Sequence, residues 1–170
     1  MKKITSTVMP IVFVGMLVAT IAQAAATATV TATVTVQNIS ISVSDGSITY
    51  GTLSSNTSTS TLSSGVNDMQ TATNNGNITE TFNIKGQNSA NWTLAGTAGS
   101  DQYVHKFCND TDLDCATPPP NYTALTTNYQ MLDTVITTSG TVNFQLEITT
   151  PNPSTVYTQQ SVDIIVQASS

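Results

Sequence analysis

Ala-Thr-Ala-Thr-Val-Thr-Ala-Thr-Val-Thr-Val, residues 26–36, is the stretch that decides the fold, together with Ile-Ser-Ile-Ser-Val, residues 39–43, which follows it closely. Between residues 27 and 36, threonine alternates with alanine or valine at every step, which indicates a β-strand with one buried face. After Gln37-Asn38 the apolar residues change from even to odd positions. Since side chains alternate with a period of two, the chain must bulge, bend or change sheets at this hinge.

The same period of two recurs along the chain between turn signals. Asp45-Gly46 predicts a hairpin turn into a strand at residues 48–50, and Asn74-Asn75-Gly76-Asn77 predicts a second turn. The Ser/Thr/Asn-rich residues 54–64 predict a loop or a weak edge strand. Three further strands are expected, each with one apolar face directed to the core. These faces are Phe82 and Ile84; Val142, Phe144, Leu146 and Ile148; and Val162, Ile164, Val166 and Ala168.

Several side chains receive specific predictions from this pattern. Glu80 shares a face with Phe82, so it is expected at an edge or at a sheet end, and Trp92 is expected in the core beside Leu94. We expect Leu132, Val135 and Ile136 in the core, and Asn143, Gln145 and Glu147 on an outward face. Eight or nine short strands without an amphipathic helical period predict an all-β fold, an antiparallel β-sandwich of immunoglobulin-like or jelly-roll type.

Composition excludes whole classes of function. The 170 residues carry a net charge of −6, four lysines and one histidine, and only 8% of residues are charged. Without arginine, and with two of the lysines at positions 2 and 3, the chain lacks the basic surface of a nucleic-acid binder. His105 is the single imidazole, and no Gly-x-Ser-x-Gly motif accompanies it, so we expect no catalytic residues, no cofactor and no enzyme activity.

Residues 1–24 have the pattern of a secretory signal peptide. Met1-Lys2-Lys3 is followed by an apolar run at residues 8–22 and by the small residues of Ala22-Gln23-Ala24. The run is shorter than the roughly 20 residues that span a bilayer, so cleavage after Ala24 is favoured over a membrane anchor. We therefore expect a secreted, extracellular or cell-surface protein with an N-terminal strand at residues 25–37 and one sandwich domain at residues 38–170.

Cys108 and Cys115 enclose six residues, and in an exported protein they are expected to form a disulfide that rigidifies a loop. Asp110, Asp112 and Asp114 lie within that loop and have the alternate spacing of calcium ligands. The sixth and twelfth positions of this loop are Cys115 and Asn121 rather than glycine and glutamate, which excludes an EF-hand. A looser calcium site and a solvated acidic loop both remain open.

Six Asn-x-Ser/Thr sequons without proline are candidate glycosylation sites if the host glycosylates exported asparagines. They begin at Asn38, Asn56, Asn77, Asn91, Asn109 and Asn121. The aromatic residues, with Trp92 foremost, also leave open a surface that stacks on sugars. One of the two functions that the sequence leaves open is therefore a secreted monomeric module that binds carbohydrate or another surface.

The N-terminal strand leaves two architectures open. It is either the first strand of its own sandwich, or it swings out at Gln37 and Asn38 and completes a neighbour's sheet as a donor strand, with Val30, Ala32, Val34 and Val36 filling a groove. Strand addition between identical subunits propagates as a homopolymer, with self as the partner.

The residues 26–36, 39–43 and 48–53 resemble the beginning of filament subunits that assemble by donor-strand complementation. The aromatic-Gly-Thr step at Tyr50-Gly51-Thr52 is similar to that of spore-coat-U-type chaperone–usher pilins. Gly51-Thr52-Leu53 and the residues 74–77 resemble fibre proteins of the TasA and archaeal bundling-pilus kind. The chain lacks the cysteine of usher-type pilins near residues 37–39. The resemblance implies a structural subunit of a filament, pilus or surface assembly.

Overall fold

A computed structural model describes residues 25–116 and 121–170. The chain divides into two units, residues 1–34 and residues 35–170. The described part of the first unit, residues 25–34, belongs to no strand and its side chains are exposed, with Val30 at 93% and Val34 at 91%. The predicted signal peptide at residues 1–24 lies outside the described residues.

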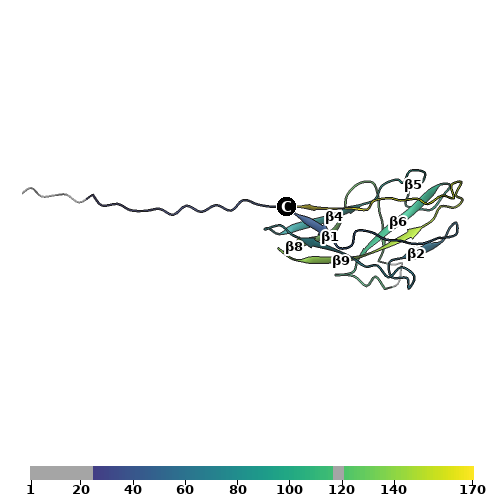
Figure 1. Ribbon diagram of the computed structural model, residues 1–170, viewed down its shortest axis with the longest axis horizontal. Helices are drawn as coiled ribbons and strands as arrows, with labels where there is room; N and C mark the ends of the chain where they lie inside the picture. Colours follow the sequence, from purple (N-terminus) through teal and green to yellow (C-terminus); the bar gives the residue numbers. More distant parts are fainter. Residues whose placement is uncertain (1–24, 117–120) are drawn as a thin grey trace, which may run out of the picture. The chain divides into compact units, whose positions relative to one another are not determined.

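The second unit is all-β and consists of two sheets (Figure 1). The larger sheet has the order β1-β3-β9-β6-β5, with β2 paired to β9 and β7 paired to β6. Its strands are β1 (Ile41–Val43), β2 (Ser58–Ser60), β3 (Gln70–Asn74), β5 (Thr93–Leu94), β6 (Gln102–Asn109), β7 (Thr123–Ala124) and β9 (Thr141–Thr149). The smaller sheet has the order β10-β4-β8 and comprises β4 (Glu80–Lys85), β8 (Gln130–Ile136) and β10 (Ile165–Ser169). All pairings are antiparallel except the short β5–β6 pair.

The hydrophobic core lies where alternate side chains of the two sheets meet, as the period of two predicts. Phe82 and Ile84 of β4 and Phe144 and Leu146 of β9 are buried in one cluster, and Ile164, Val166 and Ala168 pack against it. The structure thus confirms the predicted β-sandwich class. No described residue lies in a helix, and none of the described segments provides a helix that could cross a membrane.

The predicted outward face of β9 is wrong, because both faces of that strand are covered. Gln145 and Glu147 are buried. Thr61, after β2, donates a hydrogen bond to Gln145 Oε1, and Gln145 Nε2 donates to Asp110 Oδ2 at 2.9 Å. Glu147 forms an ion pair with Lys106, which lies directly opposite on β6, with 2.7 Å between Oε1 and Nζ. Loops and an edge strand therefore bury polar side chains that periodicity assigns to solvent.

The prediction of Val135 in the core is wrong, and that of Glu80 at a sheet end agrees with the structure. Val135 is 73% exposed, since it adopts a φ of 60°, and the pairing of β4 with β8 is irregular between Glu80 and Asn83. A β-branched residue in this left-handed region is strained and loses the alternation of the strand. Glu80 is indeed at the start of β4, at a sheet end, but it is buried, and its Oε1 accepts a hydrogen bond from the Ser40 backbone at 2.9 Å.

The turn at Asp45-Gly46 forms as predicted, but the strand after it does not. Both residues have positive φ, 61° and 71°, as the tight hairpin turn requires. Residues 48–50 nevertheless belong to no strand and do not pair back onto β1. The turn at residues 74–77 joins β3 to β4 as predicted.

Cys108 and Cys115 form the predicted disulfide, with their Cα atoms 6.0 Å apart, and pack against Tyr122. A disulfide of this kind is compatible with an extracellular protein.

We predict that replacing both Cys108 and Cys115 by alanine lowers the free energy of unfolding by about 2–3 kcal/mol, because so short a loop constrains the unfolded chain only modestly. Urea denaturation followed by Trp92 fluorescence measures the change. A loss much above this range would mean that the bridge supports the sandwich itself rather than its loop.

Candidate binding groove

A groove of about 870 Å³ opens between two segments that lie outside the strands over most of their length. The first wall is residues 43–55, which follow β1, and the second wall is residues 156–166, which lead into β10. Phe144, Leu146 and Ile148 of β9 lie at the base of the groove, between the walls. The volume is within the range of ligand-binding clefts, and the lining is mixed, since the buried polar side chains of Gln70, His105 and Thr150 accompany the apolar residues of β9.

The backbone of both walls is unpaired over most of its length. Residues 47–53 make no backbone hydrogen bond to any residue that the structure describes, and the same holds for the backbone of residues 161–164. β10 pairs with β4, and of its residues Val166 lines the groove, while β10 also contacts β1. Because unpaired backbone groups beside an apolar core are costly, such an edge is a template for another strand.

The two walls run in opposite directions along the groove. Val43 is paired with Ala72 at one end, and Ser55 Oγ donates a 2.6 Å hydrogen bond to Pro151 O at the other. The second wall begins at Val156, beside Ser154, and ends at Val166, which is paired with Ile84. We call the end with Val43 and Val166 the Asn77 end and the opposite end the Trp92 end, after the residues described next.

Trp92 lies at the groove rather than in the core, which corrects the prediction. It is half-buried, it lines the groove, and its indole Nε1 donates a 3.1 Å hydrogen bond to Ser154 Oγ. Its ring contacts that of Tyr103 at 6.2 Å between centroids, and burial raises the pKa of Tyr103 to about 12. The sequence pattern places Trp92 and Leu94 on one face of a strand. It does not reveal that, among the described residues, no other strand covers this face at Trp92.

His105 occupies the same end of the groove, on β6. Its Nε2 is 3.0 Å from the hydroxyl of Tyr50, which belongs to the first wall, and burial raises the pKa of that tyrosine well above its usual range. His105 is almost completely buried, its Nδ1 finds no partner among the described residues, and burial lowers its pKa to about 4. Among the described residues, the Tyr50 hydroxyl is the hydrogen-bond partner of this imidazole.

The predicted hinge lies at the Asn77 end and is fastened there. The side chain of Asn77 accepts a hydrogen bond from the Asn38 backbone and donates one to Val36 O, both at 2.8 Å. Asn77 N donates to Asn38 O at 3.1 Å. Gln37 and Asn38 are exposed, and the side chain of Val36 is 81% exposed. The chain is thus held from Val36 onward, while the donor residues Val30, Ala32 and Val34 precede the fastened part.

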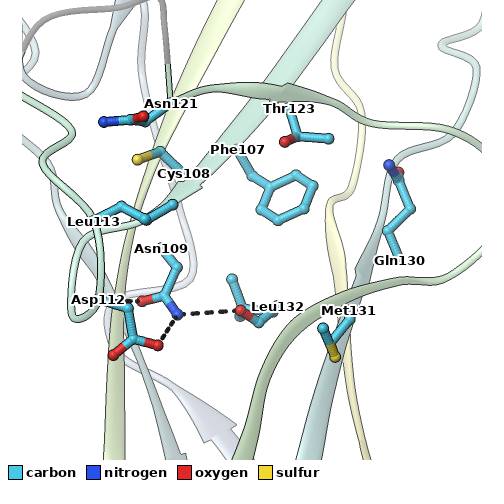
Figure 2. Close-up of a pocket in the computed structure, with 10 residues that line it drawn as sticks. All are labelled: Phe107, Cys108, Asn109, Asp112, Leu113, Asn121, Thr123, Gln130, Met131 and Leu132. Carbon is cyan, nitrogen blue, oxygen red and sulfur yellow. Dashed lines mark hydrogen bonds between the residues drawn. The ribbon is translucent and has the colours of Figure 1, made fainter.

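The three aspartates of the disulfide loop have separate partners. Asp110 bonds to Gln145, Asp112 Oδ2 accepts from Asn109 Nδ2 at 3.1 Å, and Asp114 Oδ1 accepts from the Ala116 backbone. Figure 2 shows Asn109 bonded to both Asp112 and the carbonyl of Leu132, and all three residues line a smaller cavity of about 320 Å³. Within the described residues no group of three or more His, Cys, Asp or Glu side chains converges on a metal position.

The six sequons differ in how their amides are used. Asn109 is buried, and the side chains of Asn77, Asn91 and Asn121 donate to Val36 O, Gln160 and Asp114 O. Asn38 and Asn56 are exposed. Glycosylation of all six stays a prediction.

Comparison with known proteins adds no assignment: no family model, curated protein or solved structure matches the chain.

Sequence reasoning did not find the groove or the role of Asn77. The groove lies between segments that form no strand over most of their length, and no residue pattern in the sequence indicates that a strand is absent there. A partial signal exists in the half-apolar residues 48–53 and 156–164, which alternate too weakly for strands of a complete sheet.

We predict that acid destabilises the protein through His105. Its folded pKa of about 4 lies below the ordinary 6.5, so this contribution to stability is complete above pH 6.5 and is lost as pH falls toward 4. Between pH 7.5 and pH 5 the loss is about 2 kcal/mol.

Urea denaturation of the wild type and of His105→Gln, which keeps a side-chain hydrogen-bonding group near Tyr50, measures this term. The difference in free energy of unfolding between the two pH values should shrink by about 2 kcal/mol in the variant. An equal pH dependence in both proteins would contradict the assignment to His105.

Proposed function

We propose that this protein is the structural subunit of a filament, pilus or related assembly at the cell surface, and that it polymerises by strand donation. Residues 25–36 of one copy would enter the groove of the next. One observation carries the proposal: two rows of unpaired backbone border an apolar groove in a chain that also holds an unpaired, alternating segment.

The lengths of donor and groove support this pairing. Residues 25–36 number twelve and contain no charged side chain. At about 3.3 Å per residue they can extend over roughly 40 Å. The second wall has eleven residues, Val156–Val166, of which only the last two belong to a strand. The donor is therefore long enough to reach along this wall.

The chemistry of the donor also fits the groove. Its backbone would bond to both walls, and Val30, Ala32, Val34 and Val36 would face the base at Phe144 and Leu146. Burying each valine contributes about 1.5–3 kcal/mol, and the threonines on the opposite face would remain at the surface. Ala32 has a smaller side chain than the three valines, so the donor backbone would lie closer to the base of the groove at this position.

Filament geometry fixes the direction of the donor. The donor leaves its own subunit at the Asn77 end, where β10 also ends, since Ser169 pairs with Thr81 and Glu80 bonds to Ser40. If the acceptor has the same orientation, the donor enters at the Trp92 end and runs antiparallel to β10, and growth continues. The opposite orientation returns the acceptor's donor segment to the first subunit and closes a dimer.

A second candidate function rests on Trp92. Its half-buried ring lines the groove near Tyr157, which is exposed, so a secreted monomer could bind a polysaccharide there by stacking. The unpaired backbone of residues 47–53 favours a strand over a sugar as the occupant, because a strand pairs with the N–H and C=O groups of every second residue along an edge.

We predict that Val34→Asp abolishes fibres of the chain starting at Ala25, because a carboxylate buried without a partner in an apolar groove costs several kcal/mol. Thr33→Asp, with the same new charge on the opposite face of the donor, should still assemble. Negative-stain electron microscopy and sedimentation measure the outcome. Fibres of Val34→Asp at the wild-type level would overturn the donor role.

The fluorescence of Trp92 separates the two candidate functions. The Val34→Asp monomer keeps an open groove, so a synthetic peptide of residues 25–36 should bind it and shift the Trp92 emission. The same peptide carrying Val34→Asp should not. A shift with polysaccharide and none with the wild-type peptide would favour the carbohydrate-binding module instead.

A further inference from the structure

At the Asn77 end, the side chain of Asn77 bonds to the backbone of the hinge. The proposed function does not by itself require these hydrogen bonds. Asn77 uses both polar atoms of its amide on the same three-residue stretch, accepting from Asn38 N and donating to Val36 O. Its backbone N–H donates to Asn38 O, so three hydrogen bonds fix residues 36–38 in an extended course. We call Asn77 with these three bonds the clamp.

The turn that carries the clamp is held firmly on the sandwich. Asn74 Nδ2 donates to Ile78 O and to Ile136 O, both at 2.8 Å, and Asn74 Oδ1 accepts from Gly76 N. A Cβ at Gly76 would collide with Asn38 O and Glu80 Oε1. The turn therefore approaches the hinge as closely as backbone allows, and the position of the clamp is set by buried contacts.

The clamp matters because the donor segment has two possible acceptors, its own groove and that of a neighbour. To enter its own groove, the segment must reverse at Gln37-Asn38 and would then run parallel to β10. To enter a neighbour's groove in a growing filament, it continues straight on and runs antiparallel to β10. The reversal requires that Val36 O leave Asn77 Nδ2, whereas the straight course keeps all three bonds.

We infer that Asn77 is a positioning residue for assembly: by holding residues 36–38 extended, it prevents the donor from closing its own groove and directs it to a second copy of the chain. This inference rests on the proposed function.

Asn77→Ala tests the inference, with Asn75→Ala as the matched control. Asn75 lies in the same turn, and its side chain bonds to Ser42 Oγ instead of to the hinge. In the chain starting at Ala25, Asn77→Ala should slow fibre formation about tenfold, the scale of one or two lost hydrogen bonds. Asn75→Ala should stay within about twofold of the wild type.

A second readout distinguishes redirection from simple damage to the turn. Hydrogen exchange with mass spectrometry on the monomer fraction should show protected amides in residues 27–35 of Asn77→Ala, at a level independent of protein concentration. The wild-type monomer should show these amides unprotected. Asn77→Asp, which keeps an acceptor for Asn38 N but repels Val36 O, should behave like Asn77→Ala if the alanine variant folds poorly.

The outcomes separate this inference from the proposed function. Wild-type rates for Asn77→Ala would overturn the clamp, and so would slow assembly with unprotected residues 27–35. Wild-type protein that forms no fibres, with Val34→Asp indistinguishable from it, would overturn the proposed function, whatever Asn77→Ala does.

Discussion

Two rows of unsatisfied backbone groups on either side of one apolar groove are the constraint on which the rest of the structure depends. A β-sandwich normally covers its core with strands whose ladders satisfy every N–H and C=O. Here the ladder is interrupted between residues 47–53 and β10, directly over Phe144 and Leu146. Phe144 and Leu146 are already almost completely buried, so it is the unpaired backbone of the walls that the proposed donor segment would satisfy.

The N-terminal segment, residues 25–34, has an apolar face that is exposed. These residues belong to no strand, and the side chains of Val30 and Val34 are exposed. The alternation of the segment is nevertheless more regular than that of most strands in the sandwich, as expected of a segment with one face for burial. A segment with an apolar face and no place to bury it, and a groove with no occupant, are explained together by the proposed exchange between copies.

Sequence reasoning reached the fold where one strand face decides burial and failed where loops or missing strands decide it. Phe82, Ile84, Phe144 and Leu146 follow from the period of two, and the disulfide follows from the spacing of two cysteines. Gln145 and Glu147 are buried by segments distant in sequence, which periodicity does not register. The groove and the Asn77 clamp depend on contacts between residues about 40 positions apart, and no local pattern specifies such contacts.

The smaller sheet has two edges of different quality, and this difference bears on how copies can associate. The β8 edge is irregular, with shifted register against β4 and the strained backbone of Val135, so a regular strand cannot pair along it. β10 pairs in unbroken register with β4, and its Val166 lines the groove. The β8 edge is thus closed to a regular partner by its distortion, whereas β10 keeps a regular backbone at the end of the groove. If residues 25–36 are a donor segment, as we propose, one acceptor edge and one donor segment in each copy would give association in a single direction, which is the condition for an unbranched polymer.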